Sequence, residues 1–233
     1  MSVVPLHTLE SSPAGERLLL AEGIRFAWPG GPPLLSLNWL DLNAGKRLFI
    51  EGPSGCGKST LLSILAGVLR PDAGHVDLLG HDLATASARR ADQLRADHIG
   101  LIFQQFNLIP YLNAVDNVLL ATRFSRCRSK RCGEPRTEAV RLLQHMGIDE
   151  LHRPVNRQSV GQQQRIACAR ALIGRPEVVI ADEPTSALDP PMRQRFIDLL
   201  FDECAAAGSA LLFVSHDYRL GDHFDRRLLL ERP

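Results

Sequence analysis

A glycine-rich segment in the first third of the chain has the residue types and spacing of a phosphate-binding loop. Residues 52–59 read Gly-Pro-Ser-Gly-Cys-Gly-Lys-Ser and fit the pattern GxxxxGK[ST]. Residues 47–51, with the apolar run 48–50 at their centre, predict a buried strand before the loop. Residues 61–65 predict an amphipathic helix after it, and this is the context the pattern requires. Backbone N–H groups of such a loop and of the following helix N-terminus form a nest for an anion.

The side chains of this loop indicate that the anion is the triphosphate of a nucleoside triphosphate. Lys58 is expected to bridge the β- and γ-phosphates, the Ser59 hydroxyl to ligate Mg²⁺, and Thr60 to reach the α-phosphate. The predicted nucleotide-binding residues of the loop are Gly52, Pro53, Ser54, Gly55, Cys56, Gly57, Lys58, Ser59 and Thr60.

Two adjacent carboxylates follow a second buried strand. Residues 178–181 are small, apolar and partly β-branched, which is typical of a central strand in a parallel sheet. Asp182 is expected at the carboxyl end of this strand, where open α/β sheets bind ligands, and it is suited to hold Mg²⁺ through water. Glu183 is placed to act as the general base toward an attacking water. The alternative for either carboxylate is a cap on the turn before Pro184.

The order of these motifs resembles the ATP-binding subunits of ATP-binding-cassette (ABC) transporters over roughly residues 18–230. The family signature is Leu-Ser-Gly-Gly-Gln, and residues 158–162 read Gln-Ser-Val-Gly-Gln in its place. In the family this loop contacts the γ-phosphate held by a second copy in a head-to-tail dimer. The resemblance therefore implies that Ser159, Gly161 and Gln162 act on the ATP of the partner copy.

Two residues depart from the family signature. Val160 is β-branched and replaces a glycine that permits close backbone approach, and Gln158 replaces an apolar residue. We expect weaker or slower sandwiching of the nucleotide. The site is still expected to work, because Ser159 and Gly161 remain.

Only the family resemblance implies catalytic roles for two polar residues that follow predicted strands. Gln104 follows the apolar residues 99–103, and the family places a glutamine there that contacts Mg²⁺ and the attacking water. His216 follows the apolar residues 210–215 and matches the histidine that contacts the γ-phosphate. The predicted catalytic residues are therefore Glu183, His216 and Gln104, and the predicted Mg²⁺ ligands are Ser59, Gln104 and Asp182.

Two further positions leave alternatives open. Asp189 matches a loop that links the two sites of the family dimer, but an N-cap of a helix beginning near Pro191 is an equal alternative. Trp28 matches the aromatic residue on which the family stacks adenine, and Phe26 is a competing candidate on the same strand face.

The motif order, read with the resemblance, predicts an α/β P-loop NTPase of the ABC ATPase type. It implies a RecA-like parallel-sheet core, an antiparallel β layer and an inserted helical subdomain. Residues 18–50 are expected to form short strands between Pro/Gly turns, and residues 162–230 to alternate helix and strand. The ATPase domain is predicted over residues 18–233. Its helical subdomain covers about 85–156, with helices at 114–124 and 136–146, and residues 1–17 form a poorly ordered extension.

Composition excludes several other classes. Among 233 residues, 27 Lys and Arg against 26 Asp and Glu give a net charge of +1, so no general attraction to nucleic acid is expected. No apolar run reaches the length of a membrane helix, and no signal pattern opens the chain. Five scattered cysteines predict reduced thiols in the cytoplasm without a metal site or disulfide framework.

Three local features each have two interpretations. Cys56 lies near a helix N-terminus and is expected to react with thiol reagents, or it is a small side chain tolerated in a loop. The cations of residues 123–131 contact lipid or a partner, or they lie in a solvated loop. Residues 105–112 combine a turn former with several large apolar residues. In the family this region receives a helix of the membrane permease, and the alternative is burial within the helical subdomain.

The resemblance implies an ATP-hydrolysing subunit that dimerises around two ATP and drives a separate integral-membrane permease. Residues 103–110 and 180–185 are similar to the branch serving lipoprotein release and macrolide-type efflux. ATP and Mg²⁺ are the implied cofactors, and the chain is expected on the cytoplasmic face of the membrane, bound to its permease. The alternatives are a non-transport ABC ATPase acting on nucleic acid or ribosomes, and a P-loop kinase or GTPase. A single cassette and the absent Asn-Lys-x-Asp motif count against these two alternatives.

Overall fold

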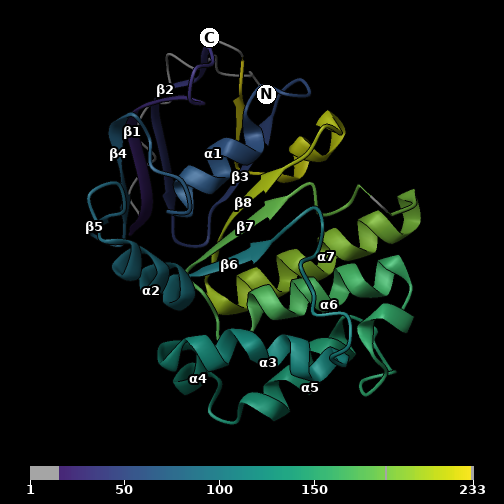
Figure 1. The fold of residues 1–233 in the computed structure, drawn as a ribbon. Helices are drawn as coiled ribbons and strands as arrows, with labels where there is room; N and C mark the ends of the chain where they lie inside the picture. The colour runs from purple at the N-terminus through teal and green to yellow at the C-terminus, as the bar shows by residue number, and fades with distance from the viewer. Residues whose placement is uncertain (1–15, 187, 232–233) are drawn as a thin grey trace. The chain divides into compact units, whose positions relative to one another are not determined.

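The computed structural model describes residues 16–186 and 188–231 (Figure 1). Their fold consists of two compact units. Unit 1 combines the described residues up to Arg95 with those from Ala210 onward, and unit 2 comprises Ala96–Ser209. The predicted N-terminal extension falls almost entirely on residues 1–15, which lie outside the described residues, and Arg17 begins the first strand.

Unit 1 contains an antiparallel sheet with the strand order β2-β1-β4-β5. Its strands are β1 (Arg17–Ala27), β2 (Pro33–Asn43), β4 (Ala73–Leu78) and β5 (His81–Asp82). The first two strands have 11 residues each, so the prediction of short strands over residues 18–50 was wrong for β1 and β2. Strand β1 continues through Gly23, because the register of β1 with β4 shifts between Glu22 and Arg25 and accommodates the glycine there.

Unit 1 also contains three parallel strands in the order β8-β3-β9. These are β3 (Arg47–Glu51), β8 (Ala210–Val214) and β9 (Arg226–Leu229). The central residues of β3 and all of β8 are buried, as expected for strands covered on both faces. Helix α1 (Lys58–Leu65) follows β3 and buries Leu61, Leu62, Ile64 and Leu65. The predicted strand–loop–helix arrangement around residues 52–59 is confirmed.

Unit 2 combines a parallel strand pair with a group of helices. The pair is β6 (Ile99–Ile102) and β7 (Val178–Asp182). The helices are α3 (Ala114–Phe124), α4 (Arg126–Cys132), α5 (Pro135–His145), α6 (Val160–Leu172) and α7 (Pro190–Ala207). Helix α3 packs against α4, α5 and α6, as Figure 1 shows, and α6 also packs against β6 and α7. Helix α2 (Ala88–His98) runs across the chain boundary between the units.

Two helix predictions agree closely with the structure. Helix α3 has the predicted bounds, and Asn113 caps it by accepting a hydrogen bond from the Asp116 N–H at 2.8 Å. Helix α5 begins at Pro135 and ends at His145, one residue earlier at each end than predicted, because proline is preferred at the first helical position. The predicted α/β class is confirmed.

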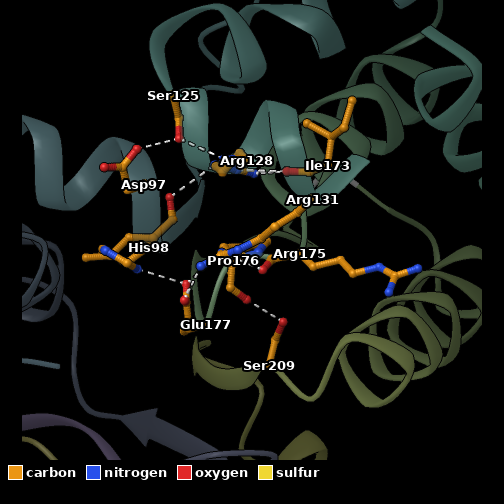
Figure 2. Close-up of polar contacts among 11 residues, drawn as sticks. Asp97, His98, Ser125, Arg128, Arg131, Ile173, Arg175, Pro176, Glu177 and Ser209 are labelled. Atoms are coloured by element: carbon orange, nitrogen blue, oxygen red, sulfur yellow. Dashed lines mark hydrogen bonds and ion pairs between the residues drawn. The ribbon is translucent and has the colours of Figure 1, made fainter. Parts of the chain in front are cut away.

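The cationic stretch 123–131 is not a solvated loop. Its residues from Arg126 onward form α4, and Arg128 is only 3% exposed. Figure 2 shows Arg128 beside Ile173. The Arg128 Nε donates to the Ile173 carbonyl at 2.8 Å, and Arg131 Nη1 donates to Glu177 Oε2 at 3.0 Å. The last carbonyls of a helix carry partial negative charge and lack partners within the helix, so the end of α6 attracts a buried cation.

Candidate nucleotide site

Two glycines of the phosphate loop stand where no side chain fits. A Cβ on Gly52 would lie 2.4 Å from the Leu230 carbonyl oxygen, and one on Gly57 would lie 2.7 Å from a Leu35 methyl group. Gly57 has a φ of 99°, a left-handed backbone that glycine adopts without strain, and it directly precedes α1. The loop therefore depends on glycine both for its close approach to neighbouring segments and for its entry into the helix.

The Lys58 ammonium is held at this loop. Lys58 is only 8% exposed, and its Nζ donates to the Gly52 carbonyl at 2.8 Å and to the Pro53 carbonyl at 3.0 Å. A cation, the backbone of the loop and the start of α1 thus lie together. This combination binds anionic oxygens.

Cys56 lies inside the protein. Its side chain is fully buried, and its sulfur would be 2.8 Å from a Cβ built on Gly52. Burial blocks direct attack by a thiol reagent, which favours the interpretation of Cys56 as a small side chain that fits under the loop.

His216 lies at the same edge of unit 1 as the phosphate loop. Strands β3 and β8 run parallel with Ile50 opposite Val214, so both strands point their carboxyl ends to one edge. The Ser215 N–H donates to the Ile50 carbonyl at 3.4 Å, which continues this alignment to the residue before His216. The His216 side chain is exposed at this edge.

Trp28 is better placed than Phe26 to meet a ligand. Phe26 is 8% exposed, whereas Trp28 is 50% exposed and packs edge-on against Phe26, with ring centroids 5.1 Å apart. Phe26 pairs across the sheet with Leu35, the residue that lies against Gly57. The end of β1 is therefore near the phosphate loop, with a large exposed aromatic ring.

In unit 2, Gln104 and the two carboxylates lie beyond neighbouring strand ends. The parallel register of β6 and β7 places Ile102 opposite Ala181, so Gln104 and Asp182 follow strands that end at one edge. Glu183 has a φ of 45°, a left-handed conformation that is strained for a residue other than glycine. Such strain persists where the surrounding structure holds the residue in place, often at functional sites.

The signature residues form a complete cap at the start of α6. The Ser159 Oγ accepts from the Gln162 N–H at 3.2 Å, and Gln162 Oε1 accepts from the Ser159 N–H at 2.8 Å. This reciprocal pair is a capping box, which fixes Ser159 and leaves the first turn of the helix ordered.

The two departures from the family signature have separate structural explanations. Gln158 is 5% exposed, and its Nε2 donates to the carbonyls of Glu150 at 3.0 Å and Arg153 at 3.3 Å. It therefore holds the turn before α6. Val160 occupies the first helical position, and its side chain is 53% exposed. Neither residue disturbs the cap on α6.

Asp189 performs the N-cap role that was one of its two predicted interpretations. Its Oδ1 accepts from the Met192 N–H at 2.9 Å at the start of α7. Leu188 lies next to Gly161, with a methyl group 3.4 Å from the position of an added Cβ. The Asp189 loop and the signature are thus neighbours in unit 2, and Ala187 lies outside the described residues.

The predicted Mg²⁺ donors fit that ion chemically. Ser59, Gln104 and Asp182 offer a hydroxyl, an amide carbonyl and a carboxylate, all hard oxygen donors of the kind Mg²⁺ prefers. The described residues contain no cluster of three or more His, Cys, Asp or Glu side chains arranged around a metal.

Two residues that the sequence did not single out hold the segment after Gln104. The Asn117 Oδ1 accepts from the Ile109 N–H at 2.8 Å, and Arg170 donates to the carbonyls of Phe106 and Asn107. An available signal was a polar Asn117 among apolar residues of a predicted amphipathic helix. Arg170 had no comparable signal.

The loop, the strand-end carboxylates and the capped α6 together define a P-loop nucleotide-binding protein. The family model described as "ABC transporter" matches residues 37–186, which is more than half of the chain. The chain belongs to the ABC transporter family.

Two curated relatives agree with this assignment. The chain is 42% identical over 193 residues to "Uncharacterized ABC transporter ATP-binding protein YbbA" of Escherichia coli (strain K12), covering 82% of this chain and 83% of that protein. It is 38% identical over 191 residues to "Lipoprotein-releasing system ATP-binding protein LolD" of Hydrogenovibrio crunogenus, covering 82% of each. The predicted resemblance to this family and to its lipoprotein-release branch is confirmed.

A solved structure supports the fold and the enzyme class. The "dimeric structure of a post-hydrolysis state of the ATP-binding cassette MJ0796 bound to ADP and Pi" superimposes with a TM-score of 0.84 at 31% identity. The match covers 92% of this chain and 94% of that one. The predicted ABC ATPase fold and the ATPase class are confirmed.

Proposed function

We propose that this chain is the ATP-hydrolysing subunit of an ABC transporter that works with a separate integral-membrane permease. The observation that carries the proposal is the Ser159 capping box in a chain that also has the phosphate loop. An exposed, capped helix N-terminus offers a hydroxyl, backbone N–H groups and a positive dipole end to an anion. Such a surface is suited to bind the γ-phosphate of an ATP molecule held by a second copy of the chain.

The proposed chemistry assigns each side chain one task. Lys58 and the backbone of residues 52–60 bind the triphosphate, and Trp28 stacks on the adenine. Glu183 takes the proton from the attacking water, and His216 stabilises charge that develops on the γ-phosphate. Ser59, Gln104 and Asp182 are the proposed Mg²⁺ ligands. When bound there, Mg²⁺ would supply positive charge that offsets the negative charge of the phosphates.

The proposed assembly is a homodimer bound to a permease. Ser159, Gly161 and Gln162 meet the ATP of the partner copy, while Asp189 links the two sites. Residues 105–112 are the proposed permease contact, supported by Tyr111, which is 76% exposed although it is a large aromatic residue. None of the described helices is long and apolar enough to cross a bilayer. The chain is proposed to lie on the inner face of the membrane through the permease, with no nucleic-acid partner.

The domain assignment follows the same proposal. Residues 18–233 form one ABC ATPase domain, and about 85–156 form its helical subdomain. Support comes from the group of helices α3, α4 and α5 in this range.

ATP-dependent dimerisation tests the proposal. Glu183→Gln should bind ATP without hydrolysing it, so gel filtration with ATP and Mg²⁺ should shift the variant from monomer to dimer. Glu183→Gln/Ser159→Ala is the matched control and should shift much less, because the signature hydroxyl is lost. A permanent monomer in all conditions would instead favour a P-loop kinase.

The permease contact needs a separate test. Ile109→Asp places a charge on residues 105–112 and should abolish co-purification with the membrane subunit while ATP binding is retained. Unchanged co-purification would remove this segment from the proposed interface.

A further inference from the structure

The segment after Gln104 has an unusual backbone. We name residues 104–109 the Gln104 segment. Within it, Phe106 and Asn107 have φ values of 41° and 50°. Two successive residues other than glycine in the left-handed region are strained, and Phe106 also lacks the short polar side chain that eases this conformation for Asn107. Something outside the segment must therefore hold it in this conformation.

Arg170, in the last turn of α6, makes the required contacts. Its Nη2 donates to the Phe106 carbonyl at 2.6 Å, and its Nη1 donates to the Asn107 carbonyl at 2.6 Å. One planar guanidinium thus binds the carbonyls of both strained residues. Burial lowers the pKa of Arg170, but the group remains a cation at neutral pH, so both hydrogen bonds are charge-assisted.

Asn117 of α3 fixes the other end of the Gln104 segment. Its Oδ1 accepts from the Ile109 N–H at 2.8 Å, and its Nδ2 donates to the Ile109 carbonyl at 3.1 Å. Asn117 is fully buried, so these bonds are shielded from water. The backbone from Phe106 to Ile109 is therefore held by one side chain from α6 and one from α3.

We propose that Arg170 is a positioning residue that fixes the Gln104 segment and thereby the placement of the Gln104 side chain. The inference rests on the proposed role of Gln104 as a Mg²⁺ ligand. Helix α6 begins at the Ser159 cap and carries Arg170 in its last turn, so one helix bears the signature at one end and binds the Gln104 segment at the other. A displacement of α6 then moves the Gln104 segment with it.

The conservative variant Arg170→Lys tests this proposal. A single ammonium cannot reproduce a planar fork that binds two carbonyls at once. Losing a charge-assisted bond should make hydrogen exchange at the Phe106, Asn107 and Ile109 amides about tenfold faster, while exchange in α6 changes little. In steady-state ATPase assays the Mg²⁺ concentration needed for half-maximal activity should rise and kcat should fall, with KM for ATP nearly unchanged.

Arg128→Lys is the matched control. Arg128 is another buried arginine that donates to backbone carbonyls, including Ile173 at the end of α6, but no hydrogen bond of its guanidinium goes to the Gln104 segment. If hydrogen exchange in the Gln104 segment becomes faster in both variants, the faster exchange reflects a general loss of stability and not the loss of Arg170, and this result overturns the proposal. Unchanged exchange or an unchanged Mg²⁺ requirement in Arg170→Lys also overturns it.

A second variant covers the case in which Arg170→Lys does not fold. Asn107 is exposed, so Asn107→Ala leaves the interior intact while it raises the strain at a left-handed position. It should speed exchange in the same amides, and no change there would refute the proposal. If the unmodified chain hydrolyses no ATP, the proposed function fails, and hydrogen exchange alone then decides whether Arg170 fixes the segment.

Discussion

Replacing Arg128 with methionine should destabilise the protein although it removes a charge from the interior. Arg128 on α4 is 3% exposed, and its guanidinium donates to the carbonyls of Ile99, Ala171 and Ile173. Figure 2 shows the contact with Ile173. Methionine has a similar length and fills the same space, so the change isolates the loss of hydrogen bonds from a loss of packing.

The expected magnitude follows from two opposing terms. Three buried carbonyls left without a donor cost about 2 kcal/mol each, or about 6 kcal/mol together. Burial lowers the pKa of Arg128 from 12.5 to about 10, so removing the buried charge returns about 3 kcal/mol. The free energy of unfolding should therefore fall by about 3 kcal/mol, which corresponds to about 6–12 °C in Tm for a chain of this size.

Thermal unfolding followed by circular dichroism measures this difference. Arg126→Met is the matched control, since Arg126 lies on the same helix and is exposed. The control should change stability by less than about 0.5 kcal/mol. If Arg128→Met unfolds at the same temperature as Arg126→Met, the carbonyls at the end of α6 do not depend on the guanidinium and the reasoning is refuted.

Three further results are expected. Asp189→Ala should lower the free energy of unfolding in urea by about 1 kcal/mol, and Asp189→Ser should retain most of it, because only the N-cap of α7 is lost. Burial opposes ionisation of Glu177, but the ion pair with His98 and the hydrogen bonds from Arg131 outweigh burial and lower its pKa from 4.5 to about 2. The stabilisation by ionised Glu177 is complete above pH 4.5 and is lost as the pH falls toward 2. The free energy of unfolding of the wild type should therefore exceed that of Glu177→Gln above pH 4.5, and the difference should shrink toward pH 2. A difference that stays constant over this pH range would contradict the prediction. Iodoacetamide should leave Cys56 unlabelled in the native protein and label it in urea, as mass spectrometry can show; native labelling would mean that the loop opens readily.

The phosphate loop was predictable because its determinants are local. The glycines, Lys58 and the apolar flanks lie within about 20 residues, and together they specify strand, turn and helix. The antiparallel strands were less predictable. Gly23 is typical of a turn in sequence, yet a pairing irregularity with β4 keeps β1 continuous through it. That outcome depends on a strand about 50 residues away, which no local pattern reveals.

The buried arginines were not predictable for the same reason. Arg128 lies among four other cations in sequence, and such a run normally indicates a solvated surface. Its main acceptor, the Ile173 carbonyl, is 45 residues away, and every residue type provides a carbonyl. Sequence identifies carboxylate partners of a cation but not backbone partners, so a cation that binds a helix end cannot be distinguished from an exposed one.

Because backbone partners cannot be identified from sequence, residues 158–162 appeared from the sequence to be a weakened signature. Gln158 departs from an apolar family residue, but its amide binds the carbonyls of Glu150 and Arg153, so the departure is compensated within the turn that precedes α6. Val160 departs from glycine at a position where its side chain points to solvent and the Ser159 cap is intact. In the proposed homodimer, any effect of these residues on ATP turnover would arise where a second copy meets Val160, because the fold of the single chain accommodates both Gln158 and Val160.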